Sequence, residues 1–291
     1  MSARKLGPFL RWAGGKRQLK PTLMQLLPAD ISKRTYREPF LGGGSLFFAL
    51  QPNSAVLSDA NEHLIKCYEF VRDHPILVAR YLRLHAANDS EAYYYQVRSM
   101  YNNSDFSAAQ AGRFIYLNKT CFNGIFRVNT KGKYNVPYGK KKSPAIPTEN
   151  ELIGIAALLK NASLRAASFE KALQNTSSGD FIYLDPPYPP LNGTAYFTHY
   201  TSDRFSAHDQ KTLADYVREL DKRGCLLMIS NADTPLTRKL YRGYNVVSLS
   251  VIRYLTCKHK RHKVKELVIT NYEVTDATSP HSKRCAEERD S

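Results

Sequence analysis

An acidic residue, two prolines and a tyrosine directly follow an apolar run of the chain, residues 181–184. They are Asp185, Pro186, Pro187 and Tyr188. At the end of a buried strand, a carboxylate and a neighbouring backbone carbonyl can each accept one N–H of a planar amino group, such as N6 of adenine. Both acceptors then stabilise the positive charge that develops as the nitrogen attacks an electrophile. Proline stiffens the backbone and removes competing donors, and the tyrosine offers a face for stacking a base. The alternative is a strand that ends in an ordinary proline-containing turn.

Three consecutive glycines at 42–44 follow a predicted strand at 36–40, and Asp59 ends the next predicted strand, 55–59. Glycine lets the backbone turn sharply and lets a ligand approach closely. Asp59 stands 17 positions after the first of these glycines, close to the spacing at which a carboxylate bonds ribose hydroxyls in nucleotide-binding units. Neither GxGxxG nor GxxxxGK[ST] is present, so pyrophosphate is not indicated. The constellation predicts a nucleoside without phosphates, and S-adenosylmethionine fits as the methyl donor.

The N-terminal segment 9–16 contains the only tryptophan, Trp12, beside two glycines and Lys16. Tryptophan usually fills a core. Here we expect Trp12 to wall the cofactor site instead, and Lys16 to donate a hydrogen bond to a carboxylate.

The composition describes an ordinary globular chain of 291 residues with 43% hydrophobic residues, enough for one well-buried domain and a smaller second one. No apolar run approaches the ~20 residues that span a bilayer, and no signal core follows the N-terminus. The five cysteines form no CxxC pair and the eight histidines no HExxH. We therefore expect a cytoplasmic protein with reduced thiols and no metal site.

Positive charge is concentrated in two acid-free stretches of a chain whose net charge is +16. A single basic stretch can be a solvated surface, but two of them favour a polyanion partner, most simply a nucleic-acid backbone. An anionic membrane is less suitable because neither stretch has the apolar stripe of an amphipathic anchor. The stretches are 106–148, with Arg113, Lys119, Arg127, Lys131, Lys133, Lys140, Lys141 and Lys142, and 251–265, with Arg253, Lys258, Lys260, Arg261, Lys263 and Lys265.

Predicted strands and helices alternate along the chain, which implies a mainly parallel sheet covered on both faces. Residues 121–148 are rich in Gly, Asn, Pro and Lys and predict loop and hairpin, whereas 275–291 lack apolar periodicity and predict a disordered tail. Further predicted strands are 163–168, 180–185, 226–230 and an antiparallel pair, 246–251 with 266–270. Predicted helices are 45–50, 60–71, several within 75–120, 149–160, 207–222 and 235–241.

Three motifs in order, FLRWAGGK, EPFLGGGSLFF and YLDPPY, resemble the Dam-type (D12 class) DNA adenine-N6 methyltransferases. The likeness spans about residues 9–272, including the segment FNGIFRVN at 122–129 and the segment YNVPYG at 134–139. It implies a Rossmann-like S-adenosylmethionine-dependent methyltransferase fold at 1–70 and 149–274, with an inserted, mostly helical target-recognition domain at 71–148. It also implies double-stranded DNA as partner, a base flipped out of the helix, the site GATC and a bacterial or phage-type enzyme without an obligate protein partner.

The resemblance also implies which residues form each site. Asp185, Pro186, Pro187 and Tyr188 would be catalytic. The cofactor would contact Trp12, Ala13, Gly14, Lys16, Phe40, Gly42, Gly44, Asp59 and Asp185. DNA would contact Arg11, Phe122, Asn123, Ile125, Arg127, Asn135, Pro137 and Tyr138.

Two other functions are compatible with parts of the pattern. Enzymes that methylate cytosine N4 or a protein glutamine typically carry Ser or Asn before Pro-Pro-Tyr, so Asp185 is unfavourable for them. A non-catalytic nucleic-acid-binding module would not need the DPPY tetrapeptide, the three glycines and Asp59 together.

Overall fold

The computed structural model of the chain describes residues 6–16, 18–188, 205–255 and 260–274. The predicted tail and part of the second basic stretch therefore lie outside the described residues. Seven strands form one sheet in the order β3-β2-β1-β4-β5-β7-β6. They are β1 (Tyr36–Glu38), β2 (Ala55–Asp59), β3 (Ala162–Ala166), β4 (Phe181–Leu184), β5 (Leu226–Ala232), β6 (Asn245–Leu255) and β7 (Lys260–Thr270).

The predicted mainly parallel sheet is confirmed. β1 pairs in parallel with β2 and β4, β2 with β3, and β4 with β5. The chain builds outward from β1 to β3 and then returns to the other side of β1 with β4, so the strand order reverses between β1 and β4. In open α/β sheets, ligands bind at such a switch point, beyond the carboxyl ends of the strands.

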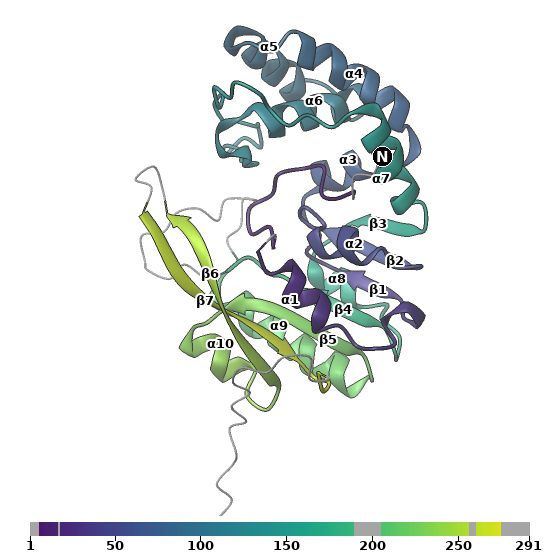
Figure 1. Cartoon of the computed structure of the whole chain (residues 1–291), viewed down its shortest axis with the longest axis vertical. Coiled ribbons are helices and arrows are strands. Elements are labelled where there is room, and N and C mark those ends of the chain that lie inside the picture. The colour runs from purple at the N-terminus through teal and green to yellow at the C-terminus, as the bar shows by residue number, and fades with distance from the viewer. Residues whose placement is uncertain (1–5, 17, 189–204, 256–259, 275–291) are drawn as a thin grey trace, which may run out of the picture.

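The predicted C-terminal antiparallel pair is also confirmed, but both strands are longer than expected. β7 runs antiparallel to β5 and to β6, and its pairing with β6 extends from Asn245 opposite Thr270 to Leu255 opposite Lys260. The hairpin projects from the sheet in Figure 1 and carries much of the second basic stretch away from the core.

Helices cover both faces of the sheet, as predicted, because neighbouring residues of a strand point to opposite faces. Phe181 and Tyr183 of β4 join a core with residues of the helices α1, α2, α3 and α7. Ile182 and Leu184 join a second core with α8 and α9. These helices are α1 (Lys20–Gln25), α2 (Ser45–Leu50), α3 (Glu62–Asp73), α7 (Glu149–Leu159), α8 (Phe169–Leu173) and α9 (Ala207–Lys222), and α10 (Pro235–Leu240) precedes β6.

Three further helices form a lobe at the top of Figure 1, beyond the edge of the sheet. They are α4 (Pro75–Ala87), α5 (Glu91–Asn102) and α6 (Ala108–Thr120). Ser90 and Ser107 cap α5 and α6 by accepting hydrogen bonds from the backbone N–H of the third helical residue, which satisfies a donor that the helix leaves unpaired.

The segment after α6 has the predicted loop and hairpin character. It begins with the short 3-10 turn η2 (Phe122–Gly124) and is held by two antiparallel bridges, Cys121 with Tyr138 and Val128 with Tyr134. We call residues 121–139 the recognition loop, after the role that the sequence predicts for them. Tyr94 and Arg98 of α5 both donate to the backbone oxygen of Val136, so this irregular loop is fastened to the helical lobe.

Candidate active site

Asp185 stands immediately beyond β4, at the switch point of the sheet. Its Oδ1 lies 2.8 Å from Nζ of Lys16, and both side chains are largely buried, with 17% and 5% exposed. The Lys16 ammonium also donates to the backbone oxygen of Gly14 at 3.0 Å. Lys16 was predicted to donate a hydrogen bond to a carboxylate, and Asp185 of the protein itself supplies one. Contact of Lys16 with the cofactor stays a prediction.

Tyr188 lies beside this ion pair, with its ring centroid 4.6 Å from the Lys16 ammonium. Its hydroxyl donates to Oε2 of Glu266 at 2.8 Å. Burial and the nearby carboxylates Asp185 and Glu266 raise the pKa of Tyr188 far above its usual range, so the hydroxyl keeps its proton. Sequence reasoning missed Glu266, although it is the first acid after the acid-free stretch 251–265.

The two prolines of the tetrapeptide differ in their surroundings. Pro186 is buried. The backbone oxygen of Pro187 accepts a hydrogen bond from Nε2 of Gln210 on α9 at 3.2 Å, and Gln210 in turn accepts one from Asn231 at 2.9 Å. Because the Pro187 carbonyl is engaged, the Pro186 carbonyl is the better candidate for accepting an N–H from the substrate.

Glu38, at the end of β1, is a second acid that sequence reasoning missed. It is only 2% exposed and accepts a hydrogen bond from the Tyr36 hydroxyl at 2.8 Å. Burial, with added repulsion from Asp185 and Asp59, raises the pKa of Glu38 to about 8. The sequence signal that could have identified Glu38 is an acidic residue at the end of a predicted strand, shortly before the glycine turn.

Replacing Glu38 with glutamine should change how stability depends on pH. With a folded pKa of about 8 against an ordinary 4.5, the contribution of Glu38 to stability is fully present below pH 4.5 and is lost as the pH rises through 8. Wild type should therefore be less stable than Glu38→Gln by about 2–4 kcal/mol near pH 8.5, relative to their difference near pH 5. Urea unfolding at both pH values measures this. The exposed change Glu219→Gln is the control, and equal pH slopes for wild type and Glu38→Gln would contradict the assignment.

Asp59 organises the glycine turn on the neighbouring strand. Its Oδ2 accepts from the Gly42 backbone N–H and its Oδ1 from that of Asn61, both at 2.9 Å. Burial of the carboxyl group raises the pKa of Asp59 despite these two bonds. Gly42 and Gly44 have φ values of 47° and 65°, a left-handed conformation that favours glycine.

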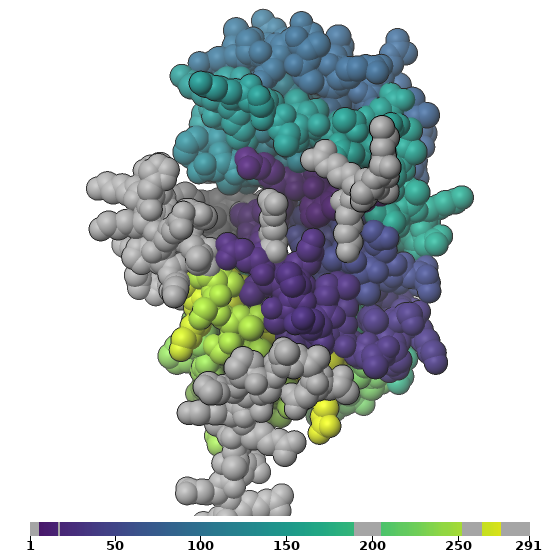
Figure 2. All heavy atoms as spheres, in the orientation of Figure 1, coloured from purple at the N-terminus to yellow at the C-terminus, as the bar shows by residue number. Residues whose placement is uncertain are grey.

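Trp12 connects the glycine turn to the recognition loop. A Cβ on Gly42 would come within 2.7 Å of the Trp12 ring, so only glycine lets the indole lie against this turn. The ring also stacks on Phe126, with centroids 5.9 Å apart. Asn118 of α6 holds the preceding residue, Arg11, by two backbone hydrogen bonds of 2.8 Å. In Figure 2 the N-terminal residues, in purple, accordingly lie between the helical lobe and the sheet.

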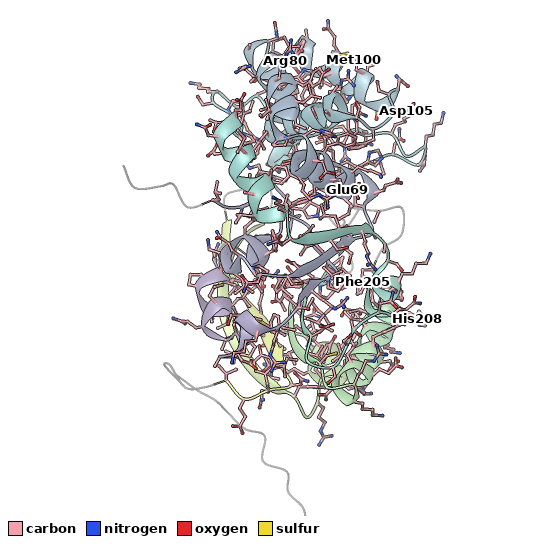
Figure 3. The ribbon with its side chains drawn as sticks, turned by 90° about the vertical axis from the view of Figure 1, so that its right-hand side faces the viewer. Glu69, Arg80, Met100, Asp105, Phe205 and His208 are labelled. Atoms are coloured by element: carbon pink, nitrogen blue, oxygen red, sulfur yellow. The ribbon has the colours of Figure 1, made fainter. Side chains whose placement is uncertain are left out.

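Phe40 lies in an aromatic cluster on the other side of the turn. Its ring stacks on Phe169 of α8 at 5.6 Å and meets Phe205 edge-on at 5.8 Å. Figure 3 labels Phe205 beside the strands, well below the helical lobe. These two phenylalanines were not predicted, since nothing in their local sequence marks them.

The predicted DNA-contacting residues share the recognition loop but differ in exposure. Phe122, Asn123 and Pro137 are exposed, and 43% of Phe122 is accessible. Ile125 packs against the core, and the Tyr138 hydroxyl donates to Asp89 at 3.2 Å.

Two arginines, Arg127 and Arg11, contact this loop. Arg127 donates through Nε to the side-chain oxygen of Asn135 at 2.8 Å and through Nη2 to its backbone oxygen at 3.4 Å. These contacts fix the plane of the guanidinium group. The exposed Arg11 covers Gly124, where a Cβ would come within 2.5 Å of the arginine side chain.

The side chains around these strand ends fit the predicted cofactor. Asp59 and Asp185 supply carboxyl groups at the ends of β2 and β4, which suit ribose hydroxyls and a positively charged ligand. Glu38 ends β1 between them, and its pKa of about 8 keeps it protonated near neutral pH. Trp12 and Phe40 supply flat apolar surfaces on either side of the glycine turn. Ala13 and Gly14 are exposed on the connecting segment, where backbone groups can contact a ligand.

Where the structure describes the chain, no three His, Cys, Asp or Glu side chains gather in a way that could hold a metal ion. None of the helices in that part combines the length and apolarity required to cross a membrane. Cys67, Cys121 and Cys225 are buried free thiols.

Known proteins resemble this chain over nearly its whole length. Residues 12–255 match the family of D12 class N6 adenine-specific DNA methyltransferases. The chain is 39% identical to type II methyltransferase M1.LlaDCHI of Lactococcus lactis subsp. cremoris, over 92% of this chain and 96% of that protein. It is 40% identical to type II methyltransferase M.MjaIII of Methanocaldococcus jannaschii, over 91% and 99% of the two chains. It is 36% identical to the DNA adenine methylase of Escherichia coli strain K12, over 89% and 93%.

Proposed function

The chain belongs to the D12 class N6 adenine-specific DNA methyltransferases, and from this premise we propose that it methylates the adenine of GATC in duplex DNA after flipping that base out of the helix. S-adenosylmethionine, when bound, supplies an electrophilic methyl group on a sulfonium. The observation that carries the proposal is the carboxylate of Asp185 at the end of β4, with Pro186, Pro187 and Tyr188 after it.

Asp185 and the Pro186 carbonyl activate the amino group in this proposal. Each accepts one N–H, which favours tetrahedral geometry at nitrogen and stabilises its developing positive charge. Tyr188 stacks on the extruded base, and its hydrogen bond to Glu266 fixes the ring. The preorganised acceptors do not have to rearrange during the reaction, which is the source of their effect on rate.

Base extrusion requires compensation, because unstacking and unpairing cost a few kcal/mol. Phe122 is exposed at the start of the recognition loop and can insert into the space that the base leaves. The two basic stretches contact phosphates on either side. In this arrangement residues 71–148 read the target, and residues 1–70 and 149–274 bind the cofactor and carry out the chemistry.

We assign cofactor binding to the glycine turn and the residues next to it. Asp59 bonds the ribose hydroxyls, Trp12 and Phe40 flank the ligand, and Gly42 and Gly44 allow its close approach. Because its substrate is genomic DNA, we place the protein in the cytoplasm with that DNA.

The proposed function is tested by expressing the chain in cells that lack adenine methylation. Long-read mapping of methylated adenines should show modification of GATC sites and of few others. A purified-protein assay with labelled S-adenosylmethionine and a GATC duplex should give N6-methyladenine on hydrolysis of the DNA. Methylation of another sequence would overturn the assigned target, and methylcytosine in place of methyladenine would overturn the chemistry.

Replacing Arg127 with alanine should relax discrimination at one base pair of the target. Arginine has five N–H donors, so the two that contact Asn135 leave others for bidentate bonding to guanine O6 and N7. Loss of that readout should reduce discrimination by about 1–3 kcal/mol, measured as methylation rates on GATC and its single-base variants.

Arg11→Ala is tested alongside, because an N-terminal reader would contact the first guanine from that position. Lys131→Ala, an exposed change in the same basic stretch, is the control for a phosphate contact and should slow every duplex alike. Arg127 contacts phosphate only if Arg127→Ala slows every duplex equally and lowers the slope of log DNA affinity against log salt concentration by about one unit.

A further inference from the structure

The Lys16 ammonium lies between two carboxylates from distant parts of the chain. Asp185 Oδ1 is 2.8 Å away and Glu266 Oε2 is 3.9 Å away. The side chains of Lys16 and Glu266 are only 5% and 6% exposed. Charges that are shielded from water interact more strongly than charges at a surface, so the position of this ammonium affects both carboxylates.

The ion pair with Lys16 opposes the role proposed for Asp185. Oδ1 accepts from the ammonium, and a carboxylate that already bonds a cation is a weaker acceptor for a neutral amino group. A second carboxylate within reach allows the ammonium to shift by rotation of a flexible side chain. Glu266 is that carboxylate.

The backbone around Glu266 is well suited to hold the Glu266 carboxylate in place. The residue lies within β7, opposite Ala232 of β5 and Leu249 of β6, so strands flank it on both sides. Its Oε2 also accepts from the Tyr188 hydroxyl at 2.8 Å. Glu266 thus contacts both Lys16 and Tyr188, and it lies beyond residues 12–255, which match the family.

We propose that Glu266 is a positioning residue for methyl transfer: it draws Lys16 away from Asp185 when substrate binds and holds the Tyr188 ring for stacking. This rests on the proposed function of Asp185 as the acceptor of the adenine amino group. The high pKa of the Tyr188 hydroxyl supports it, since a protonated hydroxyl can donate to Glu266 over the working pH range.

The test is the isosteric change Glu266→Gln. The amide oxygen can still accept from Tyr188, but it no longer attracts Lys16, so the ammonium stays on Asp185. We expect the single-turnover rate to fall roughly 10- to 100-fold, while S-adenosylmethionine and duplex affinities change less than about threefold. Fluorescence of 2-aminopurine at the target position, which reports base extrusion, should be unchanged.

Rescue by a conservative variant separates this role from a structural one. Lys16 faces Asp185, Glu266 and the Tyr188 ring. Glu266→Asp keeps the charge but sets it farther from Lys16, so its rate should lie between those of Glu266→Gln and wild type. A residue that serves only the fold would show the reverse order, because glutamine keeps the size of the side chain and aspartate does not.

Failure of the inference differs from failure of the proposed function. A wild-type protein that does not methylate adenine would remove the premise itself. An active wild type with an equally active Glu266→Gln would overturn the inference alone. A slow Glu266→Gln that melts earlier and binds both ligands poorly, with Glu266→Asp slower still, would assign Glu266 to the fold instead. If Glu266→Gln does not fold, Glu266→Asp decides: its shorter side chain sets the carboxylate back from Lys16 and Tyr188, so wild-type-like ligand binding with no loss of rate would overturn the inference.

Discussion

Replacing Asp185 with alanine is expected to slow methyl transfer at least about 100-fold, while the protein still binds duplex DNA. The carboxylate stands at the switch point of the sheet and is paired with Lys16 at 2.8 Å. Alanine removes the acceptor for the amino group just where positive charge develops. Single-turnover transfer of labelled methyl groups measures the rate, and a gel-shift titration measures DNA affinity.

Two further variants make the Asp185 result specific. Asp185→Asn keeps the shape and one oxygen acceptor but removes the charge, so its rate should also fall. Asp215→Ala removes an exposed acid on α9 that pairs with Arg218, and its rate should match wild type. Cofactor affinity is titrated separately, since Asp185 is also predicted to contact the ligand. Near wild-type turnover in Asp185→Ala would show that the residue is not catalytic.

The strands of the sheet were predictable because their local sequences are unambiguous. β4 is four consecutive buried residues followed by an acid and two prolines, a pattern that fits a strand covered on both faces. The hairpin of β6 and β7 is longer than the sequence predicted. Its outer residues, such as Lys260 and Arg261, are polar and basic, and a hairpin that leaves the core needs no apolar alternation, because backbone hydrogen bonds set its pairing.

The residues of the candidate site were predictable only where a short sequence motif contains them. Asp185 and Asp59 each end a strand beside proline or glycine signals; Asp185 lies at the switch point, and Asp59 ends β2, on the far side of β1. Glu266 is different, because its proposed role depends on Tyr188, 78 positions earlier, and no local pattern marks such a partner. The pairing of Trp12 with Phe126 depends in the same way on how the helical lobe meets the N-terminal segment. Single-sequence reasoning finds residues at element ends and misses those that meet only through the tertiary fold.

Replacing Asp59 with alanine is expected to weaken S-adenosylmethionine binding by about 100- to 10,000-fold, with little direct effect on DNA affinity. Charge-assisted hydrogen bonds contribute about 1.5–3 kcal/mol each, and two to the ribose would be lost. The structure adds a second cause, since Asp59 also bonds the backbone N–H groups of Gly42 and Asn61. Calorimetry measures the total loss, and unchanged affinity would limit Asp59 to a structural role.

A pair of ligands separates direct contact of Asp59 with the ribose from its support of the glycine turn. S-adenosylhomocysteine and its 2′,3′-dideoxyribose analogue differ only in the hydroxyls that Asp59 is predicted to bond. Wild type should bind the analogue more weakly, whereas Asp59→Ala should bind both alike, because residues and groups in contact are not additive. If Asp59→Ala discriminates between the two ligands as strongly as wild type, the hydroxyls are bound elsewhere. The loss of affinity would then come from the turn at Gly42, whose N–H has lost its acceptor.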